Sequence, residues 1–216
     1  MLPRLYTYIV ATDRGFAPNP FWGYCTLACC KPAIRRKARK GDWVVGLTPR
    51  KSGNKLLYAM RVTDEPLSFE KYFKDKRFKK KKPRWFSCEN QLCCGDNIYR
   101  RLRNGSFGQL PSWHSLPGGG RDKEQMRIDL RGERVLVSRD FFYFGSKPLS
   151  LPRKLNELIV GRGHKCNFSA TTIANFDRFI RRKPRGRNSD PTDFMENPSP
   201  GCTSRRVRQN AEKMCK

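Results

Sequence analysis

At 216 residues the chain is long enough for one domain with a hydrophobic core and short for two domains of ordinary size. Its 46 Lys and Arg against 19 Asp and Glu give a formal net charge of +27, which favours a polyanionic partner, with nucleic acid ahead of an acidic membrane surface. No apolar run reaches the roughly 18 residues of a transmembrane helix, and no signal-peptide pattern is present, so we expect a cytoplasmic protein without membrane contact.

The first third of the chain predicts a strand, an aromatic loop, a basic helix and a hairpin. Residues 5–10 (LYTYIV) are apolar on both faces, as in a central strand. Residues 15–23 hold three aromatics between prolines and glycines, which predicts a rigid loop. Residues 31–40 predict a short basic helix with a proline in its first turn and a glycine after its end. Residues 43–47 and 55–62 predict two paired strands.

The rest of the chain alternates basic, loop-like and apolar segments. Residues 68–84 are basic with interleaved aromatics, which indicates either a solvated helix or loop, or an arm that contacts phosphates and stacks on bases. Residues 104–120, rich in Gly, Ser and Pro, predict a long loop. The apolar patterns that follow predict strands at 125–130, 134–138 and 141–144, then helices at 151–160 and 171–181, the last capped by Thr171 or Thr172.

The chain becomes polar and rich in proline after residue 183. This composition predicts a basic, disordered tail. We therefore expect one domain over residues 1–183 and a tail over residues 184–216.

Candidate acid–base groups are few. His114 and His164 are the only histidines, and both lie in glycine-bearing loops, where a histidine titrates near neutrality. With Asp96 they are the candidates for catalysis, although isolated loop histidines usually make local hydrogen bonds. No Ser or Cys lies in a recognisable nucleophile elbow, and no Walker-type or dinucleotide-type glycine pattern is present. The residues alone specify no reaction.

The nine cysteines predict thiols rather than a disulfide framework. Six of them form C-x3-CC and C-x4-CC, whereas structural zinc sites use C-x2-C. We interpret them as small buried or incidental surface thiols and predict neither a metal site nor a cofactor.

Aromatic and basic residues are the remaining signal. Stacking aromatics with neighbouring amide or carboxylate groups can hold a base that is flipped out or single-stranded. The candidate base-binding residues are Asp13, Phe16, Asn19, Phe21, Trp22, Trp43, Asn97 and Tyr99, although each Asp or Asn is also a natural turn residue. The candidate phosphate-binding residues are Arg35, Arg36, Lys37, Arg39, Lys79, Lys80, Lys81, Lys82, Arg181, Arg182 and Lys183.

Several runs of the chain resemble a known family. They are YTYIVATDRGFAPNPFWGYCTLACCKPAIRRKARKGDWVVG, LLYAMRV, CGDNIY and VLVSRDFFYFGS. Over residues 4–180 they resemble the second class of nucleotide-modification-associated domains, which are often encoded beside DNA-modification genes. The order of strand, loop, basic helix, Gly-Asp, strand, turn and strand is also similar to the PUA-like superfamily, including EVE, ASCH, SRA and YTH domains. The resemblance implies an α+β fold, a small mixed β-barrel of PUA-like (EVE-like) type with flanking helices.

The sequence leaves three functional hypotheses. The first is a module that binds DNA or RNA and recognises a modified or flipped nucleobase. The second is an enzyme that acts on a nucleobase or nucleotide in a DNA-modification pathway. The third is a scaffold that recruits a modification or restriction enzyme as its partner. The resemblance carries over no catalytic residue.

Overall fold

The computed structural model describes residues 3–85, 87 and 89–194. The regular elements are, in chain order, β1 (Leu5–Ile9), β2 (Cys25–Leu27), α1 (Pro32–Lys37), β3 (Trp43–Leu47), the 3₁₀ helix η1 (Arg50–Ser52), β4 (Leu56–Arg61), β5 (Leu67–Ser68), α2 (Phe69–Lys74), η2 (Lys76–Lys81), α3 (Asn90–Cys93), β6 (Tyr99–Arg101), β7 (Phe107–Gln109), η3 (Pro117–Gly119), α4 (Lys123–Leu130), β8 (Arg134–Ser138), β9 (Asp140–Tyr143), η4 (Arg153–Leu158), β10 (His164–Lys165), α5 (Ala170–Ile180) and β11 (Gly186–Arg187).

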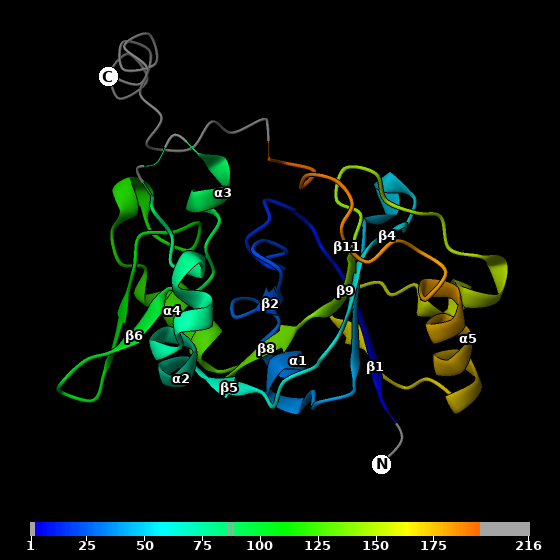
Figure 1. Cartoon of the computed structure of the whole chain (residues 1–216), viewed down its shortest axis with the longest axis horizontal. Helices are drawn as coiled ribbons and strands as arrows, with labels where there is room; N and C mark the ends of the chain where they lie inside the picture. Colours follow the sequence, from blue (N-terminus) through cyan, green and yellow to red (C-terminus); the bar gives the residue numbers. More distant parts are fainter. Residues whose placement is uncertain (1–2, 86, 88, 195–216) are drawn as a thin grey trace, which may run out of the picture.

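Six strands form the main sheet in the order β10–β1–β3–β4–β9–β11. β1 is parallel to β3, whereas β3, β4 and β9 pair antiparallel. The predicted central strand and the predicted hairpin are therefore confirmed. A second sheet has the order β2–β8–β5, and the β6–β7 pair lies with α2 and α4 at the far end of the molecule from α5 (Figure 1).

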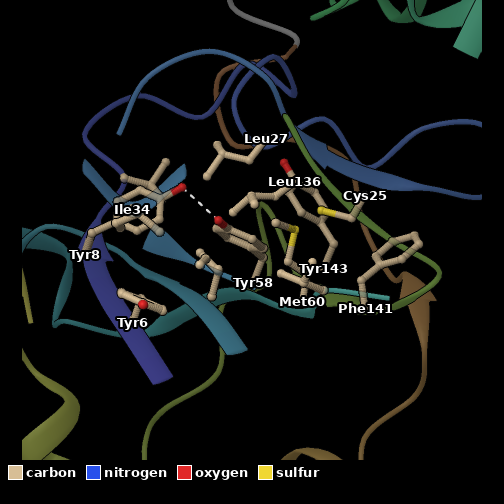
Figure 2. Packing of buried hydrophobic residues seen from close by; sticks show 14 of the residues in the cluster. Tyr6, Tyr8, Cys25, Leu27, Ile34, Tyr58, Met60, Leu136, Phe141 and Tyr143 are labelled. Atoms are coloured by element: carbon tan, nitrogen blue, oxygen red, sulfur yellow. Dashed lines mark hydrogen bonds between the residues drawn. The ribbon is translucent and has the colours of Figure 1, made fainter. Parts of the chain in front are cut away.

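Both faces of the main sheet are covered (Figure 1). On one face, Trp43 packs edge-on against Phe176 of α5, with ring centroids 5.5 Å apart. The other face packs against α1, β2 and β8. There the hydroxyls of Tyr8 and Tyr58 form a hydrogen bond of 2.8 Å inside an apolar cluster (Figure 2). This double burial explains why β1 is apolar on both sides. Within the described part of the chain, no helix is long and apolar enough to cross a membrane.

The two larger sheets are joined where one long strand bends. β8 and β9 are separated only by Arg139, and the Ser138 hydroxyl bonds to the carbonyl oxygens of Arg61 and Asp140 at 2.5 and 2.9 Å. The chain thus leaves one sheet and enters the other. Over the residues described here both sheets stay open, because the strands diverge at this bend and the main sheet ends in the two-residue strands β10 and β11. The α+β class is confirmed, but the predicted closed barrel is not observed.

Residues 125–130 lie in helix α4, so the predicted strand is wrong. The Asp122 side chain accepts a hydrogen bond from the Gln125 backbone N–H at 2.9 Å and caps the helix. Helical spacing then buries Asp129 on the inner face. The apolar residues of this segment alternate, a pattern that fits a strand as well as a helix. The hydrogen bond from the helix N-terminus to the Asp122 side chain stabilises the helix. η4 is a 3₁₀ helix where the sequence predicts an α-helix, and Ser169 caps α5 in place of the predicted threonines.

Residues 184–194 belong to the folded domain rather than to a disordered tail. β11 pairs with β9. The buried carboxylate of Asp13 accepts hydrogen bonds from the Tyr143 hydroxyl at 2.6 Å and from the Thr192 N–H at 3.1 Å. The last part of the predicted tail, residues 195–216, lies outside the described residues.

Gly46 in β3 allows Tyr58 to pack against the strand. A Cβ at position 46 would lie 2.4 Å from a ring carbon of Tyr58 and 2.7 Å from a methyl group of Val10. We expect Gly46→Ala to lower the free energy of unfolding by about 2 kcal/mol, because ring and backbone must shift. Gly161→Ala, at a position with no neighbour within 4 Å, is the control, with an expected change below about 0.5 kcal/mol. Urea unfolding measures both, and equal stabilities would contradict the packing.

Candidate functional site: a thiol, an imidazole and a carboxylate beside a basic cavity

A cavity of about 330 Å³ opens where the aromatic loop, the turn before α1 and the loop around His114 meet β1. We call it the Cys30 cavity. Its basic wall residues are Arg14, Lys31 and His114, and none of its described wall residues is acidic. The full wall comprises Tyr8, Ile9, Val10, Ala11, Thr12, Arg14, Phe16, Ala17, Cys30, Lys31, Trp113 and His114.

Cys30 lies in a tight turn between β2 and α1. Cys30 and Lys31 both have left-handed backbone angles, with φ of 60° and 42°, which few residues other than glycine adopt. The Arg35 side chain stabilises this turn by donating from Nε to the Cys30 carbonyl oxygen at 2.7 Å and from Nη2 to the Asp129 carbonyl oxygen at 2.5 Å. The prediction that Arg35 binds phosphate is therefore wrong, because its side chain is fully buried and crosslinks the turn to α4.

The buried carboxylate of Asp129 orients His114. His114 Nδ1 lies 2.6 Å from Asp129 Oδ2, and the same oxygen accepts a hydrogen bond from the Tyr99 hydroxyl at 2.8 Å. The other oxygen, Oδ1, accepts a hydrogen bond from the Cys30 backbone N–H at 2.8 Å. One carboxylate therefore joins α4, β6, the His114 loop and the turn before α1.

The His114–Asp129 pair is charged at neutral pH. Burial alone would lower the pKa of His114, but hydrogen bonds with Asp129 and Cys30 outweigh burial and raise that pKa to about 10. Burial alone would raise the pKa of Asp129, but the hydrogen bond and positive charge of His114 outweigh burial and lower that pKa below its usual value. An imidazolium thus faces the cavity.

The sulfur of Cys30 lies 3.5 Å from His114 Nε2, on the side of the ring opposite Asp129. Cys30 is half-buried and lines the cavity. Among the described cysteines, burial raises the pKa of the Cys29 thiol and raises that of Cys94 to about 12, which keeps both protonated. The thiol, imidazolium and carboxylate therefore have the order of a nucleophile, an acid–base histidine and the group that orients this histidine.

The cluster of Cys29, His114 and Asp129 is better explained by hydrogen bonds among its side chains than by a bound metal ion. Cys29 Sγ, a ring nitrogen of His114 and a carboxylate oxygen of Asp129 lie within 4.8 Å of one another, and this donor set suits zinc. However, His114 and Asp129 bond to each other directly, and both carboxylate oxygens also accept other hydrogen bonds. A metal would have to displace these bonds.

Of the predicted catalytic residues, only His114 lies in this site. Asp96 is buried elsewhere, where it accepts hydrogen bonds from the hydroxyls of Thr26 and Tyr72 at 2.7 Å each. His164 lies in the edge strand β10, where burial and the nearby charges of Lys37 and Lys31 lower its pKa. The predicted grouping of the two histidines with Asp96 is not found.

The predicted base-binding residues do not line one cavity. Phe16 lines the Cys30 cavity, Phe21 and Trp22 line a separate groove beside β11, and Trp43 lines a third hollow against α5. For these aromatics, contact with a base stays a prediction. The remaining residues are polar groups hydrogen-bonded inside the fold, namely Asp13, Asn19, Asn97 and Tyr99.

One further predicted phosphate contact is wrong. Lys81 is 1% exposed, and its ammonium donates to the backbone and side-chain oxygens of Asn19 at 2.9 and 2.6 Å and to the Tyr24 carbonyl oxygen at 2.8 Å. It crosslinks the aromatic loop and cannot reach a phosphate. For the exposed or half-buried remainder, phosphate contact stays a prediction: Arg36, Lys37, Arg39, Lys79, Lys80, Lys82, Arg181, Arg182 and Lys183.

The sequence interpretation missed Cys30 and Asp129. It groups Cys30 with the structural thiols, although a cysteine immediately before a Lys-Pro helix start is a local signal for a thiol on a strand-to-helix turn. It places Asp129 in a strand, and nothing near Asp129 points to a partner 15 residues earlier in the chain.

The His114–Asp129 pair should make stability depend on pH. Since the pKa of His114 rises on folding from 6.5 to about 10, its contribution is full below pH 6.5 and is lost as the pH rises through about 10. Breaking a buried pair costs about 3 kcal/mol. We expect His114→Gln to lower the free energy of unfolding by this amount at pH 6, with the deficit shrinking toward pH 10. A deficit that is constant across this range would contradict the ion pair.

Comparison with known families identifies the chain. A family model described as nucleotide modification associated domain 2 matches residues 2–198. No curated protein and no solved structure matches the chain. The matched span contains the whole Cys30 cavity and the ordered segment 184–194. The chain therefore belongs to the family of nucleotide modification associated domain 2.

Proposed function

We propose that the protein binds nucleic acid in a DNA-modification system and holds one nucleobase in the Cys30 cavity. Family membership suggests a role in nucleotide modification, and the net charge of +27 favours a polyanion. The observation that carries the proposal is the cavity wall, which combines aromatic and basic side chains without an acidic one among its described residues. A cytoplasmic location and a modifying or restriction enzyme as partner stay predictions.

The cavity suits a single flat ring. The ring centroids of Phe16 and His114 are 4.8 Å apart. The Arg14 guanidinium lies 4.3 Å from the Trp113 ring centroid. Unstacked bases bind by stacking on such aromatic and guanidinium planes. A volume of about 330 Å³ is at the lower end of small-molecule sites, roughly 300–1,000 Å³, which favours one base over a base pair.

Lys31 and Arg14 supply positive charge for the attached phosphate. The Lys31 ammonium lies 4.6 Å from the Tyr8 ring centroid, and partial burial lowers its pKa. Partial exclusion of water strengthens the attraction of such a cation for an anion. These two side chains are therefore the proposed phosphate contacts of the bound nucleotide.

A second groove gives a neighbouring nucleotide a place to bind. It has a volume of about 460 Å³, and its walls include Trp22, Arg139 and Arg187. The Arg139 guanidinium lies 5.0 Å from the Tyr24 ring centroid and that of Arg187 lies 5.3 Å from the Phe21 ring centroid. Basic groups that alternate with aromatic rings are typical of single-strand binding surfaces. We infer that a single strand crosses both hollows.

Removing charge from the cavity should weaken nucleic-acid binding. We expect Arg14→Gln and Lys31→Gln each to raise the Kd of a single-stranded oligonucleotide about tenfold, because each removes a phosphate contact. Lys154→Gln removes the same charge from the exposed side of η4 and should change the Kd less than about twofold. Fluorescence anisotropy at low and high salt measures all three. Equal losses in the three variants would attribute binding to net charge and contradict the cavity.

The second groove should matter for a strand and not for a single nucleotide. We expect Arg139→Gln to raise the Kd of an oligonucleotide about fivefold and to leave the Kd of a nucleoside monophosphate unchanged. Calorimetry with both ligands tests this. Weaker binding of the monophosphate as well would place Arg139 in the base site and contradict the two-hollow arrangement.

A further inference from the structure

Simple binding of a base does not require the ion pair beside Cys30. The site holds a half-buried thiol, an imidazolium and a buried carboxylate in hydrogen-bonded sequence at the wall of the cavity. We propose that Cys30 is a nucleophile that adds to C6 of a pyrimidine base held in the Cys30 cavity, with His114 as its proton donor. This inference rests on the proposed binding of a base.

The geometry of the three groups carries the inference. Cys30 Sγ lies 3.5 Å from His114 Nε2, a contact loose enough to tighten when a ligand enters. The opposite ring nitrogen lies 2.6 Å from Asp129. Nε2 therefore faces the sulfur, and Nδ1 is used by the carboxylate, which is the arrangement that an acid–base histidine needs.

Asp129 is the positioning residue. Hydrogen bonds from the Tyr99 hydroxyl and the Cys30 N–H hold its two oxygens, at 2.8 Å each, so the carboxylate cannot turn away from His114. The second of these bonds also holds the backbone of the nucleophile. The distance from sulfur to imidazole is thus set through one rigid group.

The described groups closest to the Cys30 sulfur at the cavity wall include two cations. His114 is 16% exposed at its side chain, and Asp129 is not exposed, so their interaction is weakly screened. The imidazolium of His114 lies beside the Cys30 sulfur, and Lys31, the next residue, lines the same cavity. The other cavity cation is Arg14.

The nature of the bound ring defines the reaction. Among the ring carbons of the bases, C6 of a pyrimidine is conjugated to a carbonyl or imine and accepts a soft thiolate. Sγ forms a bond to C6, the π electrons of C5=C6 move to C5, and C5 takes the proton of His114 Nε2. Reversal returns a proton from C5 to Nε2, and the S–C6 electrons return to sulfur. The adduct needs no further reactant. When Nε2 removes the C5 proton while the S–C6 bond is intact, the electron pair stays on C5, the carbon at which a partner enzyme can then modify the base.

Thiol reactivity tests the nucleophile without nucleic acid. We expect iodoacetamide to alkylate Cys30 about tenfold faster than the exposed Cys166 at neutral pH, and His114→Gln and Asp129→Asn to remove the difference. Peptide mapping by mass spectrometry reports both cysteines in one sample, and continued protection of buried Cys25 shows that each variant is folded. Alkylation of Cys30 no faster than Cys166 in the wild type would overturn the proposal.

Covalent capture tests the substrate. The probe is a single-stranded oligonucleotide that contains 5-fluorouracil, whose fluorine makes C6 more electrophilic. We expect an adduct on the Cys30 peptide after denaturation, absent in Cys30→Ser, reduced about tenfold in His114→Gln, and unchanged in Cys166→Ser. A fluorinated strand that binds without forming an adduct would overturn this inference alone.

Two other outcomes distinguish a failure of the nucleophile proposal from a failure of the proposed base binding. Fast, His114-dependent alkylation with no binding of any oligonucleotide would overturn the proposed function and the pyrimidine step with it. A stoichiometric metal ion in the purified protein that is lost in Cys29→Ala would overturn the nucleophile, because the same side chains would then be ligands.

Discussion

The structure around the candidate site depends on one buried carboxylate. Asp129 of α4 accepts hydrogen bonds from a histidine, a tyrosine hydroxyl and a backbone N–H, and these groups come from three other segments of the chain. An unpaired carboxylate at this depth would be costly, so the segments are held together by the need to satisfy it. The same bonds fix the imidazole beside the sulfur. Stability and site geometry therefore have one cause.

Two basic side chains, Arg35 and Lys81, serve the fold rather than a ligand. Arg35 donates to three carbonyl oxygens, including that of Arg134, and fixes the turn that carries Cys30. Lys81 donates to two oxygens of Asn19 in the aromatic loop and to the carbonyl oxygen of Tyr24, just after it. Both are buried, so the net charge overstates the charge that a polyanion meets. The cations that matter at the cavity are few, and they lie against aromatic rings, which limits how far they can move.

The site lies at a junction, which accounts for its mixture of groups. β1 and the aromatic loop provide an apolar wall, the turn before α1 provides the thiol, and the loop before α4 provides the imidazole. The bend between β8 and β9 carries the chain from the sheet that contains β2 into the sheet that contains β1. The segment 184–194 holds a residue just before the aromatic loop, because Asp13 forms hydrogen bonds with Thr192 and Asp193. A rigid frame that carries reactive loops is a common way to build a functional site.

The sequence alone determined the strands with strong apolar patterns, the basic helix, the α+β class and the family, because local periodicity and distinctive motifs carry that information. It did not determine the burial of Arg35 and Lys81 or the helix over residues 125–130, because a basic residue or a short apolar alternation has two environments that fit it equally well. Tertiary structure decided the site itself. Cys30 lies 84 residues before His114 and 99 residues before Asp129 in the chain. No local sequence pattern shows that the Asp129 carboxylate is hydrogen-bonded by groups from several distant segments.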